Sequence, residues 1–235
     1  MRVIIDDAPR FMRGLRIMFA ADMHIRDITS EKYIGDIAHM LESEGADMLL
    51  LGGDYGESTD AAIRFLGAIR PEKFPMGIFG VVGNNDVELF SEIDELHRVF
   101  PGELIINDKR EVKLRGGRLM IGGLDEIKYG AFPEKNLFER AYDSYSILLS
   151  HFPKLPSWIS GARARLMLSG HTHGGQFRMF GLDPYTIGYE SGEVDAVNGL
   201  HEMGGTHLLV SNGIGVSKLP LRIGCPPQIH LIDFA

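Results

Sequence analysis

Leu168-Ser-Gly-His-Thr-His-Gly-Gly-Gln176 is the stretch around which this chain is organised. Two imidazoles, those of His171 and His173, lie one residue apart between glycines, directly after the apolar run 166–168. If that run is a strand, its end releases the backbone into a turn where glycines allow a close approach to whatever the imidazoles hold. Histidine is the commonest metal ligand, so the stretch indicates a metal site. A lone histidine pair is more often structural, and the rest of the chain decides between the two readings.

Four more groups of oxygen and nitrogen donors follow short apolar runs in the same way. The runs span residues 17–21, 48–51, 78–82 and 147–149, and the groups that follow them are Asp22-Met-His24, Gly53-Asp54, Gly83-Asn-Asn-Asp86 and Ser150-His-Phe152. In an open α/β sheet, ligands gather beyond the carboxyl ends of the strands, so these groups can converge on one point. Carboxylate, amide and imidazole donors together suit a divalent transition metal.

The composition is that of an ordinary globular protein. Of the 235 residues, 44% are hydrophobic and 24% charged, and no repeat or linker-like tract interrupts them. Because α/β folds of this length are routinely one domain, we expect residues 1–235 to form a single domain. The net charge of −8 disfavours a broad nonspecific grip on nucleic acid.

The sequence shows no targeting or membrane signal. The apolar run before Asp6 is too short for a signal peptide, and no stretch approaches the roughly 18 apolar residues that span a bilayer. The lone Cys225 cannot form an internal disulfide. We therefore expect a cytoplasmic protein, whose oligomeric state the sequence does not indicate.

Hydrophobic periodicity predicts alternating strands and helices in the first half of the chain. Strands are expected at 15–21, 47–51 and 77–82, with an edge strand possible at 3–5. One helix begins at Thr29 or Ser30 and ends at Gly45. A second begins near Thr59, is stopped by Pro71 and points Ile63, Leu66 and Ile69 inward. A third helix follows residue 86 and ends near residue 100.

The second half has a different pattern. Short runs at 104–106, 112–114 and 119–121, separated by turn residues, predict antiparallel strands and hence a second sheet. Further strands are expected at 145–149 and 163–168, short helices at 136–142 and 153–160, and two last strands of the second sheet at 206–211 and 228–234. The glycine-rich segment 176–205 is expected to be a loop over a site.

The motifs together resemble a known family. Five motifs, spread over most of the chain, resemble those of the calcineurin-like metallophosphoesterases and occur in the same order. They are Asp22-x-His24, Gly53-Asp54, Gly83-Asn84-x-Asp86, His151 and Gly170-His171-x-His173. The forms Leu149-Ser-His151, Ser169-Gly-His-Thr-His-Gly-Gly-Gln176 and Pro220-Leu-Arg-Ile-Gly-Cys-Pro-Pro-Gln-Ile229 resemble a narrower bacterial group of small phosphodiesterases. The resemblance implies an α/β fold, a four-layer α/β/β/α sandwich in which two mixed β-sheets are flanked by helices.

The resemblance also implies two metal ions. Carried over by position, the ligands of one ion are Asp22, His24, Asp54 and His173, and those of the other are Asp54, Asn84, His151 and His171. Ions in such sites lie about 3.5–4 Å apart, so one carboxylate must serve both. Mn²⁺ is the first expectation, with Fe and Zn²⁺ as alternatives. The function implied is hydrolysis of a phosphodiester, phosphomonoester or pyrophosphate of a small molecule by a metal-bridging hydroxide.

One position departs from the family pattern. Where the family usually has a histidine that protonates the leaving oxygen and is oriented by an acid, this chain has Asn85. An amide cannot act as a general acid, a role typically worth about 10²–10⁴ in rate. Either the substrate has an acidic leaving group, such as a pyrophosphate or aryl ester, or His201 or His207 supplies the proton. The candidate catalytic residues are Asp54, Asn84, Asn85 and Asp86.

Two other functions fit the same residues. A nuclease can use the same centre, but the dispersed Lys and Arg residues offer little affinity for a polymer. A metal-binding scaffold without activity is the second alternative, although all seven ligands are present.

Overall fold

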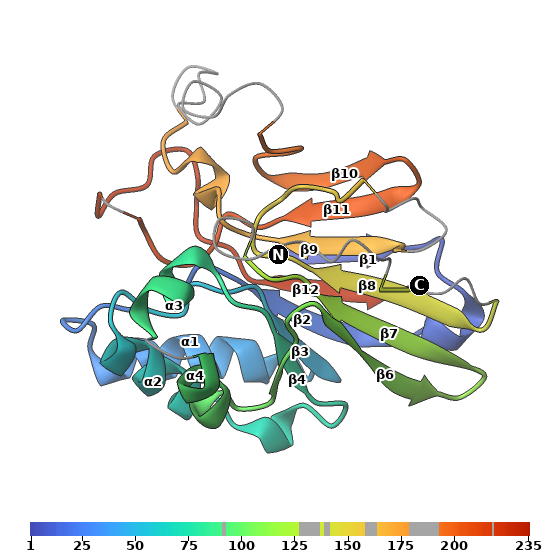
Figure 1. Ribbon diagram of the computed structural model, residues 1–235, viewed down its shortest axis with the longest axis horizontal. Helices are drawn as coiled ribbons and strands as arrows, with labels where there is room; N and C mark the ends of the chain where they lie inside the picture. Colours follow the sequence, from blue (N-terminus) through green and yellow to red (C-terminus); the bar gives the residue numbers. More distant parts are fainter. Residues whose placement is uncertain (91–92, 127–136, 139–141, 158–163, 179–192, 218) are drawn as a thin grey trace.

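The computed structural model describes residues 1–90, 93–126, 137–138, 142–157, 164–178, 193–217 and 219–235. Within these residues the strands form two six-stranded sheets, with the orders β1-β12-β2-β3-β4-β5 and β10-β11-β9-β8-β7-β6. In Figure 1 the two sheets overlap in the view, and the helices α1 to α4 gather on the first sheet. None of the described helices combines the length and the apolar character that crossing a bilayer requires.

The first sheet contains the strands of the first half of the chain and one late strand. Its members are β1 (Arg2–Ile5), β12 (His230–Phe234), β2 (Arg16–Ala20), β3 (Met48–Leu51), β4 (Ile78–Gly80) and β5 (Glu103–Leu104). All neighbours are parallel except β12 and β2. The predictions that placed β5 in an antiparallel segment and β12 in the second sheet were wrong. A short apolar run predicts a strand but not its partner, and here β5 extends β4 while β12 lies between β1 and β2.

The second sheet is mixed. It contains β10 (Gly199–Met203), β11 (Thr206–Val210), β9 (Leu166–Ser169), β8 (Ser144–Leu149), β7 (Gly117–Gly123) and β6 (Asp108–Leu114). The four inner strands are parallel, and an antiparallel strand closes each edge. Strand β10 lies in the segment predicted to be a loop. As an edge strand with its three central residues exposed, it has no hydrophobic period that the sequence could reveal.

The helices largely follow the predicted pattern. They are α1 (Glu31–Ser43), α2 (Thr59–Ala68), α3 (Asn84–Leu89) and α4 (Ile93–Val99). Ser30 caps α1 by accepting a hydrogen bond from the Tyr33 backbone N–H at 3.3 Å. The predicted third helix is divided into α3 and α4. Leu66 and Ile69 are buried as predicted, but Ile63 is only half-buried, and the fully buried Phe65 was not predicted.

The two short helices predicted at 136–142 and 153–160 are not confirmed. Residues 153–157 are not helical, and the rest of the predicted 153–160 helix lies outside the described residues. Most of the predicted 136–142 helix also lies outside them.

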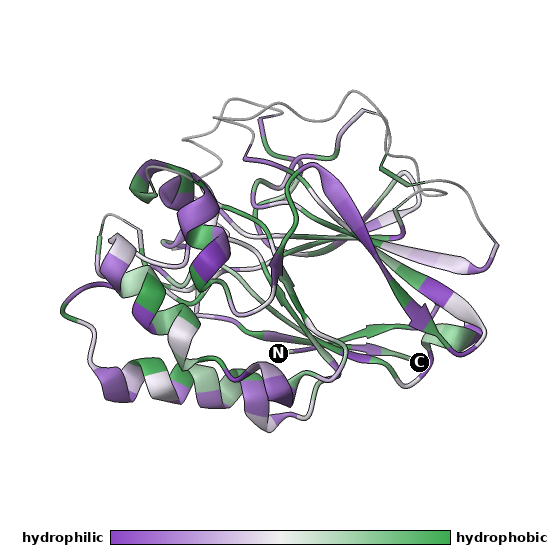
Figure 2. Ribbon diagram, turned by 60° about the horizontal axis from the view of Figure 1, so that its bottom comes forward, coloured by the Kyte–Doolittle hydropathy of each residue, from purple (hydrophilic) through white to green (hydrophobic). Residues whose placement is uncertain are grey.

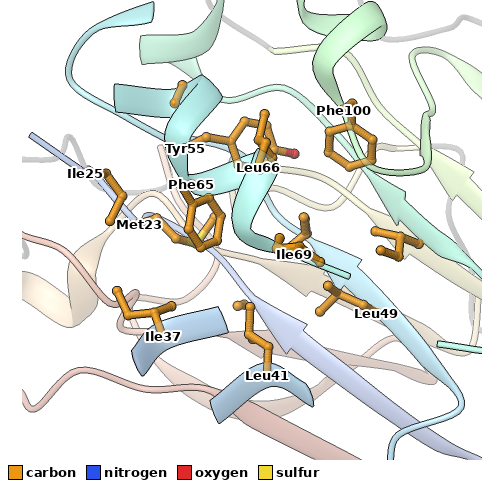
Figure 3. Packing of buried hydrophobic residues seen from close by; sticks show 14 of the residues in the cluster. Met23, Ile25, Ile37, Leu41, Leu49, Tyr55, Phe65, Leu66, Ile69 and Phe100 are labelled. Carbon is orange, nitrogen blue, oxygen red and sulfur yellow. The ribbon is translucent and has the colours of Figure 1, made fainter. Parts of the chain in front are cut away.

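Three clusters of buried residues form the layers. The first lies between the first sheet and its helices and includes Leu49, Phe65 and Phe100 (Figure 3). The second lies between the sheets and includes Phe19 and Leu168. The third covers the other face of the second sheet. Figure 2 shows helices that alternate between hydrophilic and hydrophobic residues, as expected when one face packs on a sheet. The predicted sandwich of two mixed sheets flanked by helices is confirmed.

A buried histidine in β12 should make stability depend on pH. His230 is fully buried, and neither ring nitrogen has a hydrogen-bond partner among the described residues. Burial lowers its pKa from 6.5 to about 4. Between these values the unfolded chain binds a proton that the folded chain does not, so stability falls as the pH drops from 6.5 towards 4. The loss should reach about 3 kcal/mol.

Urea unfolding of the wild type and of His230→Phe, both in EDTA, at pH 7, 5.5 and 4.5 measures this effect. The variant should lose less stability on acidification than the wild type does. His39→Phe, which replaces an exposed histidine of α1, is the matched control. Parallel stability curves for the wild type and His230→Phe would contradict the assignment.

Candidate metal centre

The seven predicted ligands lie at the carboxyl ends of five strands. Asp22 and His24 follow β2, Asp54 follows β3, and Asn84 opens α3 after β4. His151 follows β8, and the remaining pair, His171 and His173, follows β9. Strands β2, β3 and β4 are parallel in the first sheet, and β8 and β9 are parallel in the second. The strand ends of both sheets therefore meet at one edge of the sandwich, and all seven side chains lie together there.

One group of donors comes from β2 and β9. Ligand atoms of Asp22, His24 and His173 lie within 4.8 Å of one another, and all three residues are buried. The Nε2 atoms of His24 and His173 are 3.0 Å apart. Asp22 Oδ1 lies 3.6 Å from His173 Nε2. This group corresponds to the first predicted ligand set, apart from Asp54.

A second group contains residues that follow β2, β3, β4, β8 and β9. Asp22, Asp54 and His151 also have ligand atoms within 4.8 Å of one another. His171 Nδ1 lies 3.2 Å from His151 Nε2 and 2.9 Å from Asn84 Oδ1. Asn84 and His171 therefore extend this group, which then contains every member of the second predicted set.

A single carboxylate oxygen lies between the two groups. Asp54 Oδ2 is 3.3 Å from His24 Nε2 and 3.4 Å from His151 Nε2. The other oxygen, Oδ1, accepts a hydrogen bond from the Asn85 backbone N–H at 2.9 Å. Asp22 is a member of both groups, but its Oδ1 is 3.6 Å from His173 Nε2 and 4.0 Å from His151 Nε2, which are longer distances than those of Asp54 Oδ2.

The outer nitrogens of two rings decide which nitrogen faces the centre. His151 Nδ1 lies 2.7 Å from the Gly52 carbonyl oxygen, to which it donates, and His24 Nδ1 lies 2.6 Å from Glu57 Oε1. In each neutral ring Nε2 then carries a lone pair that faces the carboxylate of Asp54. Two lone pairs facing one another are favourable only when a proton or a cation lies between them. The arrangement therefore fits metal ions, with the outer contacts that metal-bound histidines usually have.

Without metal, these side chains hold protons. Burial disfavours a charged His24, but hydrogen bonds to Asp54 and Glu57 raise its pKa to about 10. Burial likewise opposes protonation of His151, yet the charge of Asp54 raises the pKa of that ring well above its usual value. Burial raises the pKa of Asp22 to about 6. A metal that binds here must displace protons, so its affinity rises with pH.

The backbone is strained at the ligands themselves. Five of the seven have left-handed φ angles, namely Asp22 (51°), His24 (42°), Asp54 (57°), His171 (71°) and His173 (52°). Such conformations are uncommon for residues other than glycine and cluster at functional sites. Two glycines pack against the carboxylates of Asp54 and Asp22. A Cβ on Gly83 would lie 2.1 Å from Asp54 Oδ1, and one on Gly170 would lie 2.2 Å from Asp22 Oδ2.

Asp86 faces the backbone rather than the donors. It is fully buried, and its oxygens accept hydrogen bonds from the backbone N–H groups of Asp54 (2.7 Å), Tyr55 (3.0 Å) and Gly83 (2.9 Å). Burial, together with the nearby charge of Asp54, raises its pKa to about 7. Its contacts fix the loop that carries Asp54, and none of them reaches Asn85.

The alternative proton donors lie elsewhere. His207 pairs with Leu166 at the start of β9, whereas the ligands follow the end of that strand, and its Nε2 lies 3.3 Å from Asp7 Oδ1. His201 is exposed on the edge strand β10, with its Nε2 2.7 Å from the Asn198 carbonyl oxygen. His207 therefore lies at the end of its strand away from the ligands, and His201 lies opposite Leu208 in the middle of β10. Proton donation by either histidine stays a prediction.

Comparison with known proteins agrees with this geometry. Residues 15–175 match the sequence profile of the calcineurin-like phosphoesterases, a segment that carries all seven donors. This chain belongs to the calcineurin-like phosphoesterase family. The family consists of metal-dependent hydrolases of phosphate esters, and the donor groups above are where this phosphoesterase has residues suited to divalent ions.

Several bacterial relatives are similar over nearly the whole phosphoesterase. The uncharacterized protein YpbG of Bacillus subtilis is 30% identical over 93% of this chain and 80% of its own length. An uncharacterized metallophosphoesterase of Aquifex aeolicus is also 30% identical, over 93% of this chain and 84% of its own. The phosphodiesterase YaeI of Escherichia coli is 25% identical, over 93% and 81% respectively.

Two residues of this phosphoesterase that contact the candidate ligands were not predicted from the sequence. Glu57 lies three residues after Asp54 and contacts His24, but no periodicity distinguishes it from other exposed acids. Arg222 belongs to the quoted tail segment, to which no role was given. Its guanidinium donates to the carbonyl oxygens of Asn212 (2.7 Å) and His173 (3.1 Å), so it ties the loop after β11 to the loop after β9.

Proposed function

We propose that this phosphoesterase uses two divalent ions to hydrolyse a phosphate ester of a small molecule. One ion would be held by Asp22, His24, Asp54 and His173, and the other by Asp54, Asn84, His151 and His171. Mn²⁺ is the first ion to test, with Fe and Zn²⁺ next. The metal identity and a cytoplasmic location stay predictions.

The position of Asp54 Oδ2 is the observation that supports the proposal most. It lies at nearly the same distance, 3.3 and 3.4 Å, from one imidazole nitrogen of each group. An oxygen in that place is suited to bridge two cations, and ions about 3.5–4 Å apart need such a bridge. The Asn85 backbone N–H binds Oδ1 and thereby keeps Oδ2 turned towards the imidazoles.

The protein's own part in the reaction is to orient the donor atoms. When bound, the two ions would supply a water-derived nucleophile at neutral pH and neutralise charge on the phosphoryl oxygens. His151 and His24 keep Nε2 inward because Gly52 and Glu57 hold their Nδ1 atoms. Asn84 contributes a neutral oxygen, which adds a ligand without adding negative charge where the phosphate must bind.

The substrate class follows from charge and from position 85. The net charge of −8 favours a small phosphate ester over a nucleic acid, because contacts from Lys and Arg provide most of the affinity for a polymer. The naming of the relative YaeI as a phosphodiesterase supports a diester. An amide at position 85 favours an acidic leaving group, such as an aryl ester or a pyrophosphate.

Hydrolysis of bis-p-nitrophenyl phosphate and p-nitrophenyl phosphate by EDTA-treated protein, with and without added Mn²⁺, tests the proposal. We expect turnover of the diester that depends on added metal, with two ions bound per chain. Failure to hydrolyse either ester with two ions bound would favour a noncatalytic scaffold. A salt-sensitive gel shift with DNA or RNA, combined with its cleavage, would instead favour a nuclease.

A further inference from the structure

The two candidate ligand sets are connected by hydrogen bonds outside the metal positions. Asn84 Nδ2 donates to Asn85 Oδ1 at 3.0 Å. Asn85 Nδ2 donates to Glu57 Oε1 at 3.4 Å and lies 3.2 Å from His24 Nδ1. Glu57 Oε1 in turn accepts from His24 Nδ1 at 2.6 Å. The connection thus begins at Asn84, a candidate ligand of one ion, and ends at His24, a candidate ligand of the other.

Only one orientation of the two amide groups gives every donor in this connection an acceptor. An amide presents one oxygen and one NH₂ group, so an Asn84 that donates Nδ2 to Asn85 must turn Oδ1 towards His171, as observed. The same logic directs Asn85 Nδ2 to the carboxylate of Glu57. That carboxylate accepts from His24 Nδ1 and so leaves His24 Nε2 free to face the centre.

We propose that Asn85 and Glu57 are positioning residues that together fix the amide of Asn84 and the ring of His24. This inference rests on the proposed two-metal site and adds two residues to it. Asn85 then has a structural reason to be an amide: it must accept from Asn84 and donate to Glu57 at the same time. A histidine side chain at position 85 can do both only in one tautomer and with a different reach.

The surroundings of Glu57 agree with a role at the site rather than in the fold. Its side chain is 36% exposed, so burial of its stem does not hold it in place. Its carboxylate oxygen Oε1 accepts from His24 Nδ1 at 2.6 Å. Charged acceptors strengthen the hydrogen bond from a metal-bound imidazole and keep the ring in one orientation.

Calorimetric titration of the metal-free protein with Mn²⁺ tests the inference without reference to activity. Glu57→Ala should weaken binding of one ion, and Asn85→Ala of the other, each by about 10–100-fold. Glu57→Gln should recover part of the loss, because an amide oxygen still accepts from His24. Glu72→Ala removes an exposed carboxylate of η2 (Pro71–Lys73), which precedes β4, and is the matched control.

The double variant separates a shared connection from two local effects. Because both single variants break the same connection, Glu57→Ala/Asn85→Ala should lose less affinity than the product of the two single losses. The paramagnetic resonance spectrum should change from that of coupled Mn²⁺ ions towards that of isolated ones. Wild-type affinities in Glu57→Ala, in Asn85→Ala and in the double variant would overturn the inference while leaving the two-metal proposal intact. A wild type that binds fewer than two ions would overturn the proposal itself.

Discussion

Asp54→Asn should abolish the binding of both metal ions and lower kcat/KM for bis-p-nitrophenyl phosphate by at least about 10³-fold. The reason is geometric: among the carboxylate oxygens of the described residues, Asp54 Oδ2 alone lies within 3.4 Å of an imidazole nitrogen in each donor group. The amide of an asparagine has the same shape but no negative charge. It either turns its neutral oxygen towards the cations or turns its NH₂ group towards them, and both orientations weaken metal binding. Inductively coupled plasma mass spectrometry of the desalted protein, together with steady-state kinetics, measures both effects.

Asp22→Asn distinguishes a bridging role for Asp54 from one for Asp22. Asp22 also has an oxygen near each group, but it lies 4.0 Å from His151 Nε2, and both its oxygens accept from the His171 backbone N–H. We expect Asp22→Asn to lose one ion and keep the other. If Asp22→Asn loses both ions and Asp54→Asn only one, the assignment of the bridge is reversed. Asp60→Asn, an exposed carboxylate in the first turn of α2, is the control.

The second large effect concerns the leaving group. The wild type should hydrolyse an aryl phosphodiester at least about 10²-fold faster than an alkyl phosphodiester of similar size, because Asn85 is an amide where a general acid would assist departure of the alkoxide. The side-chain groups beside Asn85 are the amide of Asn84, the imidazole of His24 and the carboxylate of Glu57. The hydrogen bond from His24 lowers the pKa of Glu57, so that carboxyl has no proton to give at neutral pH.

Asn85→His should reverse this preference in part. A protonated imidazole at position 85 next to Glu57 should raise the rate for the alkyl diester by about 10²-fold, whereas the aryl rate should fall because the contact with Asn84 is lost. Asn85→Gln, which keeps an amide, should show no gain on the alkyl ester. Equal wild-type rates on aryl and alkyl diesters would remove the reason for an acidic leaving group.

The parts of this protein that the sequence reveals are those with a local chemical signature. Strands β2, β3 and β4 are buried on both faces, so they read as continuous apolar runs, and the polar group after each run falls at a carboxyl end. Parallel pairing then brings those ends together. The seven donors could be placed in one site because each is fixed by the strand that precedes it.

The parts that the sequence conceals depend on partners far along the chain. The apolar run of β12 is compatible with either sheet, and its pairing with β1 on one side and with β2 on the other places it in the first. Strand β10 is held by backbone hydrogen bonds to β11, which any sequence can make. The proposed role of Glu57 depends on its contact with the ring of His24, which lies 33 positions away in the chain.

The left-handed backbone at Asp22, His24, Asp54, His171 and His173 has a consequence for protein engineering. Glycine at any of these positions would relax the local conformation, where each such residue costs of order 1–3 kcal/mol. A search for thermostable variants that ignores metal content would therefore select substitutions at the very residues that bind the ions. Stability and metal binding therefore place opposite demands on the same five positions.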